Sequence, residues 1–201
     1  MIFLRHAHDL KIIPRISAAV TRGDTPNIDQ LQAYGVRYIE TDNEPLGAKH
    51  NAALSFAGPS ERYMILPSDD LISPEWLKVF DTTTSDYIAP DRCGVYDTVN
   101  KVCKVLHNRP NGRRNFGAGR IFSRDVVDAL GGKVWTDEKP AGLDTDSHAR
   151  ISAAGYAMDV HTCERVPLTD LKSTVNLWAY GVFKGEPSTP EEVLHMAPWI
   201  L

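Results

Sequence analysis

Short apolar segments alternate with helical segments from residue 15 to residue 67, and this alternation restricts the chain to few folds. Strands are expected at 15–21 (RISAAVT), 36–41 (VRYIET) and 62–67 (RYMILP), with helices at 25–35 and 48–57 between them. Neighbouring parallel strands need a crossover connection, and a helix of this length supplies one. The pattern therefore predicts an α/β fold with a mixed, mostly parallel sheet flanked by helices.

Proline, glycine and capping residues mark the ends of several elements. Pro26 suits the first turn of a helix that Gly35 ends, and Ser73 with Pro74 suits the start of another helix. The remaining expected elements are a helix at 2–13 halted by Pro14, a hairpin at 86–107, a glycine-rich loop at 116–120, a strand and helix at 121–132, a helix from 143, a last strand at 159–166 and a capping box at Thr189–Glu192.

Composition excludes several classes of protein. The 201 residues, 42% of them hydrophobic, suffice for one domain with a large core, and the net charge of −4 gives no overall basic surface for nucleic acid. Only 108–115 (NRPNGRRN) could form a local basic patch, and a solvated loop is the interpretation that we favour for it. The three cysteines form no C-x-x-C pair, which argues against a zinc or disulfide framework and fits the cytoplasm. No membrane span or signal peptide is recognisable.

Two adjacent carboxylates, Asp69 and Asp70, follow the apolar run of the third expected strand. In open α/β sheets the carboxyl ends of parallel strands line the crevice where ligands bind. Two like charges there are costly unless a cation or hydrogen-bond donors neutralise them, and magnesium or manganese prefers such oxygen ligands. The pattern predicts a metal site, with a polar turn in which Asp70 caps the backbone as the alternative.

Other polar residues could share this site. Asp24 ends the first strand, and Lys49 and Asn51 enter a helix after Gly47, an arrangement that suits an anion such as a diphosphate without the P-loop spacing. Asp144, Asp146 and His148 open a later helix, where a carboxylate could act as a general base or could complement the helix dipole. His161 lies in the segment of the last expected strand and could be a metal ligand or a structural histidine.

In their order along the chain, these motifs resemble those of family-2-like glycosyltransferases of the GT-A fold. The resemblance covers the region from Arg15 to Leu171. The matching segments are VTRGD (20–24), NEPLGAKHNAAL (43–54), PSDDLISPEWL (67–77), FGAGRIFSRDVVDALGG (116–132) and GLDTDSHARISAAGY (142–156).

The resemblance implies a single GT-A-like domain, with a nucleotide-binding half at 1–75, a donor-sugar and acceptor half at 76–170 and a tail at 171–201. It implies metal-dependent transfer of a hexose from a UDP-sugar to a hydroxyl acceptor with Mn²⁺ or Mg²⁺. By the same resemblance the metal and diphosphate ligands are Asp69 and Asp70 with His161 as a third ligand, the nucleotide-sugar contacts are Asp24, Lys49, Asn51, Gly117, Ala118 and Gly119, and the base is Asp144 with Asp146 in reserve.

The chain departs from the family pattern in three places. Pro67 stands where the acidic motif begins, and Leu143 stands where a glutamate precedes the catalytic aspartate. The family's first strand, with its base-binding loop, has no counterpart before the helix at 2–13. Either the natural chain starts upstream, or the site is incomplete and the protein weakly active. The open sheet position could accept another segment or a second chain, so an oligomer is possible.

Two other functions stay open beside glycosyl transfer. A nucleotidyltransferase shares a similar sheet and a metal-binding aspartate, but it normally opens on a glycine-rich loop with a basic residue, and none precedes Gly23. A degenerate domain that binds a sugar or a partner without catalysis would fit Pro67 and Leu143. The acceptor could be a glycan, a lipid-linked sugar, a protein or a modified nucleobase, and the phage-like compactness of the chain favours a soluble or DNA acceptor.

Overall fold

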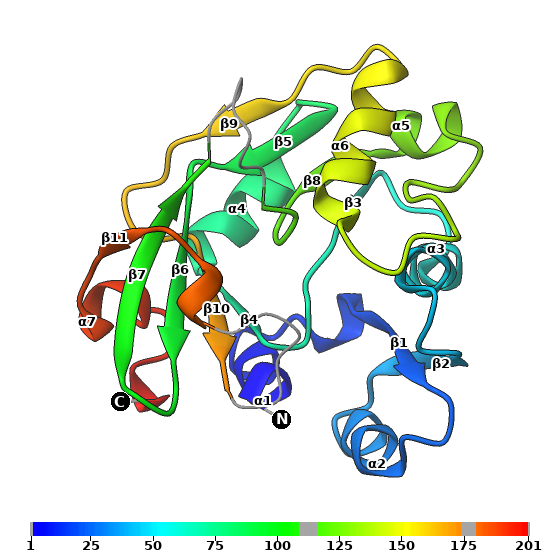
Figure 1. Cartoon of the computed structure of the whole chain (residues 1–201). Coiled ribbons are helices and arrows are strands. Elements are labelled where there is room, and N and C mark those ends of the chain that lie inside the picture. Colours follow the sequence, from blue (N-terminus) through cyan, green and yellow to red (C-terminus); the bar gives the residue numbers. More distant parts are fainter. Residues whose placement is uncertain (1, 109–115, 174–179, 201) are drawn as a thin grey trace. The chain divides into compact units, whose positions relative to one another are not determined.

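The computed structural model describes residues 2–108, 116–173 and 180–200 and divides the chain into two compact units (Figure 1). Unit 1 comprises residues 1–63 and 122–157, and unit 2 comprises residues 64–121 and 158–201. The described residues form seven α-helices and eleven strands, which confirms the predicted α/β class. The predicted basic loop falls largely at 109–115, outside the described residues.

Unit 1 contains the first strand–helix–strand crossover expected from the sequence. Its elements are α1 (Ile2–Asp9), the 3-10 helix η1 (Ile13–Arg15), β1 (Ser17–Thr21), α2 (Thr25–Ala33), β2 (Arg37–Thr41), α3 (Leu46–Ala57), α5 (Arg124–Ala129) and α6 (Leu143–Ala153). β1 and β2 run parallel, with Ser17 beside Arg37 and Thr21 beside Thr41. The short strands β3 (Arg62–Met64) and β8 (Ile121–Ser123) lie where the chain passes from one unit to the other.

The first crossover forms because each segment buries one apolar side. Val20 of β1, Leu31 of α2 and Leu54 of α3 are buried. Among the described residues, β1 and β2 form a sheet of only two strands. The expected open position beside this sheet stays a prediction.

Unit 2 is built around a five-stranded sheet in the order β11-β7-β6-β10-β4. Its elements are β4 (Asp70–Ile72), α4 (Pro74–Thr82), β5 (Tyr87–Pro90), β6 (Arg92–Asp97), β7 (Val102–His107), β9 (Asp159–His161), β10 (Leu168–Lys172), η2 (Tyr180–Val182), β11 (Glu186–Pro187), α7 (Pro190–Val193) and η3 (Pro198–Ile200). The expected hairpin is the antiparallel pair β6 and β7, seen in green in Figure 1. β10 pairs in parallel with β6 and antiparallel with β4.

The C-terminal residues complete the core of unit 2. Val193, Leu194 and Ala197 are fully buried in a cluster with Leu71 of β4 and Tyr96 of β6. The helix α7 begins as predicted at the Thr189 cap, whose Oγ1 accepts a hydrogen bond from the Glu192 amide. The Glu192 carboxylate accepts a hydrogen bond from the Ser188 hydroxyl.

Two expectations about the strands of unit 2 were wrong. Asp69 and Asp70 were expected after the end of a strand, but Asp70 is the first residue of a further strand, β4, which pairs with β10. The last strand was expected at 159–166, but β9 ends at His161. A further strand, β10, begins at Leu168. Both differences arise because the strands pair with segments that are distant in the sequence: β4 with β10, and β9 with β5.

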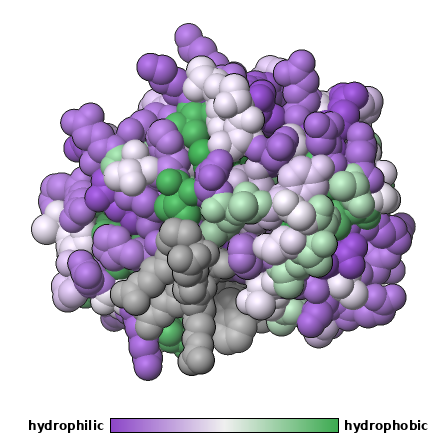
Figure 2. Space-filling model, turned by 90° about the horizontal axis from the view of Figure 1, so that it is seen from above, coloured by the Kyte–Doolittle hydropathy of each residue, from purple (hydrophilic) through white to green (hydrophobic). Residues whose placement is uncertain are grey.

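One face of the chain is mainly polar. Figure 2 shows that hydrophilic residues predominate on this face and that hydrophobic residues gather in smaller areas. Among the described residues, the exposed large hydrophobic side chains are Ile2, Val99, Val102 and Val182. Within the described part of the chain, no helix has the length and apolar character needed to cross a bilayer.

Candidate functional site

The pairing of β4 with β10 gathers three carboxylates in unit 2. Asp70 and Asp170 are direct cross-strand partners, and the Leu171 amide donates a hydrogen bond to the Asp69 carbonyl oxygen (2.9 Å). One carboxylate oxygen from each of Asp69, Asp70 and Asp170 lies within 4.8 Å of the other two. This spacing and this all-oxygen donor set fit a hard divalent cation such as Mg²⁺ or Mn²⁺.

The side chain of Lys172 lies among these carboxylates. Its Nζ is 2.7 Å from Asp170 Oδ2 and 3.6 Å from Asp69 Oδ2, and 8% of its side chain is exposed. Burial alone would lower the pKa of Lys172, but the charges of Asp170, Asp69 and Asp70 and the hydrogen bond to Asp170 outweigh burial and raise it. The Lys172 side chain therefore stays protonated at neutral pH, and its positive charge neutralises part of the negative charge of the three carboxylates.

His161 is not part of the carboxylate group, in which Asp170 is the third member, and a role of His161 as a metal ligand stays a prediction. His161 ends β9, which pairs with β5, and its ring lies 6.0 Å from that of Trp76. The strand that pairs with β4 is β10 and not β9, and this strand order explains why Asp170, and not His161, lies beside Asp70.

The predicted sugar-binding loop has a clear structural function. Gly119 has a φ of +71°, and a Cβ there would overlap the side chain of Leu168. Its carbonyl oxygen accepts a hydrogen bond from Trp76 Nε1 (2.8 Å), and its amide donates to the Ile65 carbonyl (2.9 Å). Glycine at 119 is thus required by packing, and a contact of Gly117, Ala118 and Gly119 with a sugar stays a prediction.

In unit 1, Lys49 lies at the carboxyl ends of β1 and β2. Its Nζ is 2.9 Å from Thr21 Oγ1 and 3.0 Å from Asn43 Oδ1. Burial lowers the pKa of Lys49, and the charge of Asp24 partly opposes this shift. The structure thus brings together Lys49 and Asp24, both predicted, at the sheet edge where ligands bind in open α/β folds.

Asp24 also caps the helix that follows β1. Its Oδ1 accepts a hydrogen bond from the Asn27 amide at 3.5 Å, and its Oδ2 accepts one from Asn27 Nδ2 at 2.7 Å. This capping role is a sufficient structural reason for an acidic residue at position 24, even if Asp24 binds no ligand. A contact between Asp24 and a base or ribose stays a prediction.

Asn51 and Asp146 hold the segment that precedes α6. Asn51 Nδ2 donates to the Trp135 carbonyl and to Asp137 Oδ1, both at 2.7 Å, while Asn51 Oδ1 accepts from the Trp135 amide. Asp146 accepts hydrogen bonds from the amide (2.7 Å) and hydroxyl (3.0 Å) of Thr136. Asn51 was predicted to bind the ligand and Asp146 to be the reserve base, and both side chains make hydrogen bonds within unit 1.

Asp144 differs from Asp146 in its surroundings. It lies in the first turn of α6 and is exposed. An acidic residue at this position complements the dipole of the helix. Asp144 is thus the more accessible of the two carboxylates predicted as a base.

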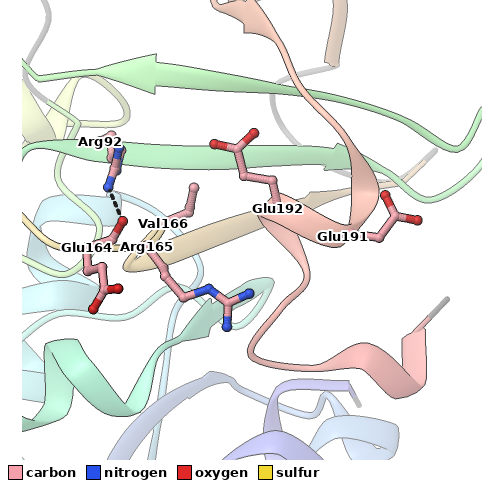
Figure 3. A pocket seen from close by; sticks show the side chains of 6 residues that line it. All are labelled: Arg92, Glu164, Arg165, Val166, Glu191 and Glu192. Carbon is pink, nitrogen blue, oxygen red and sulfur yellow. Dashed lines mark hydrogen bonds between the residues drawn. The ribbon is translucent and has the colours of Figure 1, made fainter.

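A hollow of about 340 Å³ lies elsewhere in unit 2, lined by Arg92, Glu164, Arg165, Val166, Glu191 and Glu192 (Figure 3). Arg92 donates a hydrogen bond across its edge to the Glu164 carbonyl at 2.8 Å. The lining contains none of the predicted site residues. Its mixed charges identify no class of ligand.

Comparison with known proteins identifies the fold. HddC from Yersinia pseudotuberculosis, complexed with GMP-PN, superimposes with a TM-score of 0.51 at 14% sequence identity, covering 84% of this chain and 77% of HddC. The two chains share a mixed α/β fold. A protein from Bacillus anthracis assigned as a glucose-1-phosphate thymidylyltransferase, in complex with sucrose, gives a TM-score of 0.47 at 12% identity over 82% of this chain and 73% of its own. No protein-family model and no curated protein match the sequence.

The sequence analysis missed four residues that lie beside the carboxylates of unit 2 or beside Lys49 in unit 1. Asp170 and Lys172 lie on β10, and Thr21 and Asn43 hold the Lys49 ammonium. The segment 168–172 (LTDLK) shows no alternation of apolar and polar residues, so its sequence carries no clear signal for a strand. Even a predicted strand would have had no known partner, so the sequence could not have joined Asp170 to Asp70.

Proposed function

We propose that the chain is a transferase that binds a nucleoside-diphosphate sugar together with Mg²⁺ or Mn²⁺. The carboxylate group of Asp69, Asp70 and Asp170 carries this proposal, because its spacing and chemistry fit a divalent cation. Such a cation, when bound, neutralises negative charge on a diphosphate. Within unit 1, taken by itself, Lys49 and Asp24 lie at the carboxyl ends of β1 and β2 and are proposed to contact a nucleotide.

The first proposed reaction is transfer of the sugar from a UDP-sugar to a hydroxyl acceptor. The order of the GT-A-like motifs supports this reaction, and Asp144 is the proposed base that takes the proton of the acceptor hydroxyl. Its exposure on α6 leaves it accessible to an acceptor. Replacing it in Asp144→Asn should reduce sugar transfer and leave binding of the cation unchanged.

The second proposed reaction is nucleotidyl transfer, in which a sugar 1-phosphate attacks a nucleoside triphosphate and releases pyrophosphate. The fold likeness to HddC, which was crystallised with GMP-PN, supports this reaction at least as well as it supports glycosyl transfer. The products separate the two reactions. A UDP-sugar donor yields UDP in glycosyl transfer, whereas a nucleoside triphosphate with a sugar 1-phosphate yields pyrophosphate in nucleotidyl transfer.

Binding and turnover should be measured with UDP-sugars, and with GTP or dTTP plus sugar 1-phosphates, each in the presence of Mn²⁺. Asp69→Asn and Asp170→Asn should lower cation affinity and activity about 10-fold or more, because each removes a charged ligand. Asp86→Asn is the matched control, since Asp86 is an exposed aspartate of unit 2 outside the group. The proposal is wrong if no nucleotide or nucleotide sugar raises the melting temperature and no product forms.

A further inference from the structure

Lys172 brings an internal positive charge to the proposed cation site. It follows Asp170 by two residues on β10, so the two side chains lie on the same face of the strand. Its Nζ is 2.7 Å from Asp170 Oδ2 and 3.6 Å from Asp69 Oδ2. The ammonium therefore contacts two of the three carboxylates that would hold a metal ion.

The remaining surroundings of Lys172 keep the ammonium close to these carboxylates. The side chain is 8% exposed, and Nζ lies 5.2 Å from the centre of the Phe183 ring, which can stabilise a cation through its face. Asp70, the most buried of the carboxylates at 2% exposure, is the direct partner of Asp170 across the sheet. A buried ion pair of this kind stabilises the charges of the carboxylates without a metal ion.

A divalent cation and the ammonium would compete for the same oxygens. A cation bound to Asp69 and Asp170 would stand within a few ångströms of Nζ, where two positive charges repel strongly at low dielectric. The flexible four-carbon stem of lysine allows the ammonium to move away from the carboxylates. A guanidinium, which is planar and binds a carboxylate through two N–H groups, would be harder to displace. Occupation by one cation should therefore displace the other.

We propose that Lys172 is the resident counter-ion of the Asp69, Asp70 and Asp170 group, and that a divalent cation binds only by displacing its ammonium. This inference rests on the cation site of the proposed function and adds a competitor that sets its affinity. Lys172 keeps unit 2 folded when the metal is absent and weakens metal binding when it is present. It acts through the carboxylates and is a positioning residue.

The test is a titration of purified full-length protein with Mn²⁺ alone, followed by calorimetry. Lys172→Met removes the charge and keeps the length of the side chain, so its Mn²⁺ affinity should exceed that of the wild type about 10-fold or more. Without metal the variant should melt at a lower temperature than the wild type, and Mn²⁺ should raise its melting temperature by the larger amount. Lys172→Arg, which keeps the charge, should not gain affinity.

A second measurement uses only the wild-type protein. Acetylation of lysine side chains, followed by mass spectrometry, should be faster at Lys172 with Mn²⁺ than without it, because displacement exposes the amine. Lys78, an exposed lysine on α4, is the internal reference and should label at the same rate in both samples. This readout does not depend on whether a variant folds.

The outcomes separate this inference from the proposed function. Equal Mn²⁺ affinity of Lys172→Met and the wild type, or unchanged labelling of Lys172 in the metal-bound protein, overturns the competition and leaves the cation site standing. Absence of Mn²⁺ binding in both proteins overturns both ideas. The three carboxylates and Lys172 would then be an internal ion-pair network only.

Discussion

The side chain of His50 lies in an environment that excludes its charged form. Its ring makes an edge contact with Trp135 at 5.0 Å between centres, and its Nδ1 is buried with no hydrogen-bond partner among the described residues. Burial lowers the pKa of His50 to about 4, and the neighbouring charge of Lys49 adds to the shift. The folded chain therefore holds this histidine neutral at a pH where an unfolded chain would protonate it.

This shift predicts a pH dependence of stability. Between pH 6.5 and about 4 the unfolded state binds a proton that the folded state does not, so the free energy of unfolding falls as the pH falls. The contribution is about 3 kcal/mol at most, from 1.4 kcal/mol per pH unit. His50→Phe, which keeps the aromatic contact, should lose less stability than the wild type between pH 7 and pH 4 in urea unfolding. Identical slopes for the two proteins would contradict the assignment.

At the scale of elements, the first turn of α3 makes a close backbone approach to the segment at 136–139. The amides of Gly47 and Ala48 donate hydrogen bonds to the carbonyls of Lys139 (2.9 Å) and Asp137 (3.1 Å). A Cβ on Gly47 would overlap the carbonyl oxygen of Thr136. Glycine is thus required here by the approach of another backbone, whatever contact the same turn makes with a ligand.

Gly47→Ala should therefore destabilise the protein by about 1–3 kcal/mol or more, because the backbone of 136–139 must move to admit a methyl group. Gly181→Ala is the matched control, since nothing lies within 4 Å of a Cβ at that position and its φ is not positive. Chemical denaturation of both variants measures the difference. If Gly47→Ala lowers the free energy of unfolding no more than the control does, the backbone of 136–139 moves to admit the methyl group without loss of stability.

The early elements were predictable because their signals are local. Pro26 and Gly35 marked α2, Ser73 marked the start of α4, and hydrophobic periodicity located β1 and β2. The carboxylate group was predictable only in part, because Asp69 and Asp70 are adjacent in sequence but Asp170 joins them through strand pairing across about 100 residues. Register between distant strands depends on the packing of the whole sheet, which a local pattern does not contain.

At the scale of the whole molecule, the thiol groups are gathered in one unit and shielded from solvent. All three cysteines, Cys93, Cys103 and Cys163, lie in unit 2 and are buried as free thiols. Burial raises the pKa of each thiol, to about 12 for Cys163. Few thiolates therefore exist at neutral pH, and those that form are shielded from reagents.

Labelling with a thiol reagent such as DTNB should report global unfolding. The native protein should react at least about 100-fold more slowly than the unfolded chain, because both burial and the raised pKa protect the thiols. Full labelling of three cysteines is expected in denaturant. Rapid reaction of one cysteine in the native protein would show that the part of unit 2 around it opens locally.

The division of the chain into units has a consequence for its synthesis. Unit 1 needs residues 122–157 to complete it, and the 58 residues from 64 to 121 belong to unit 2. A ribosome adds about 5–20 residues per second, so α1 to α3 wait for roughly 3 to 12 seconds before α5 and α6 are made. During that time the amides of Gly47 and Ala48 and the side chain of Asn51 lack their hydrogen-bond partners in the segment 135–139, so the N-terminal part of unit 1 cannot reach its final structure until that segment is made.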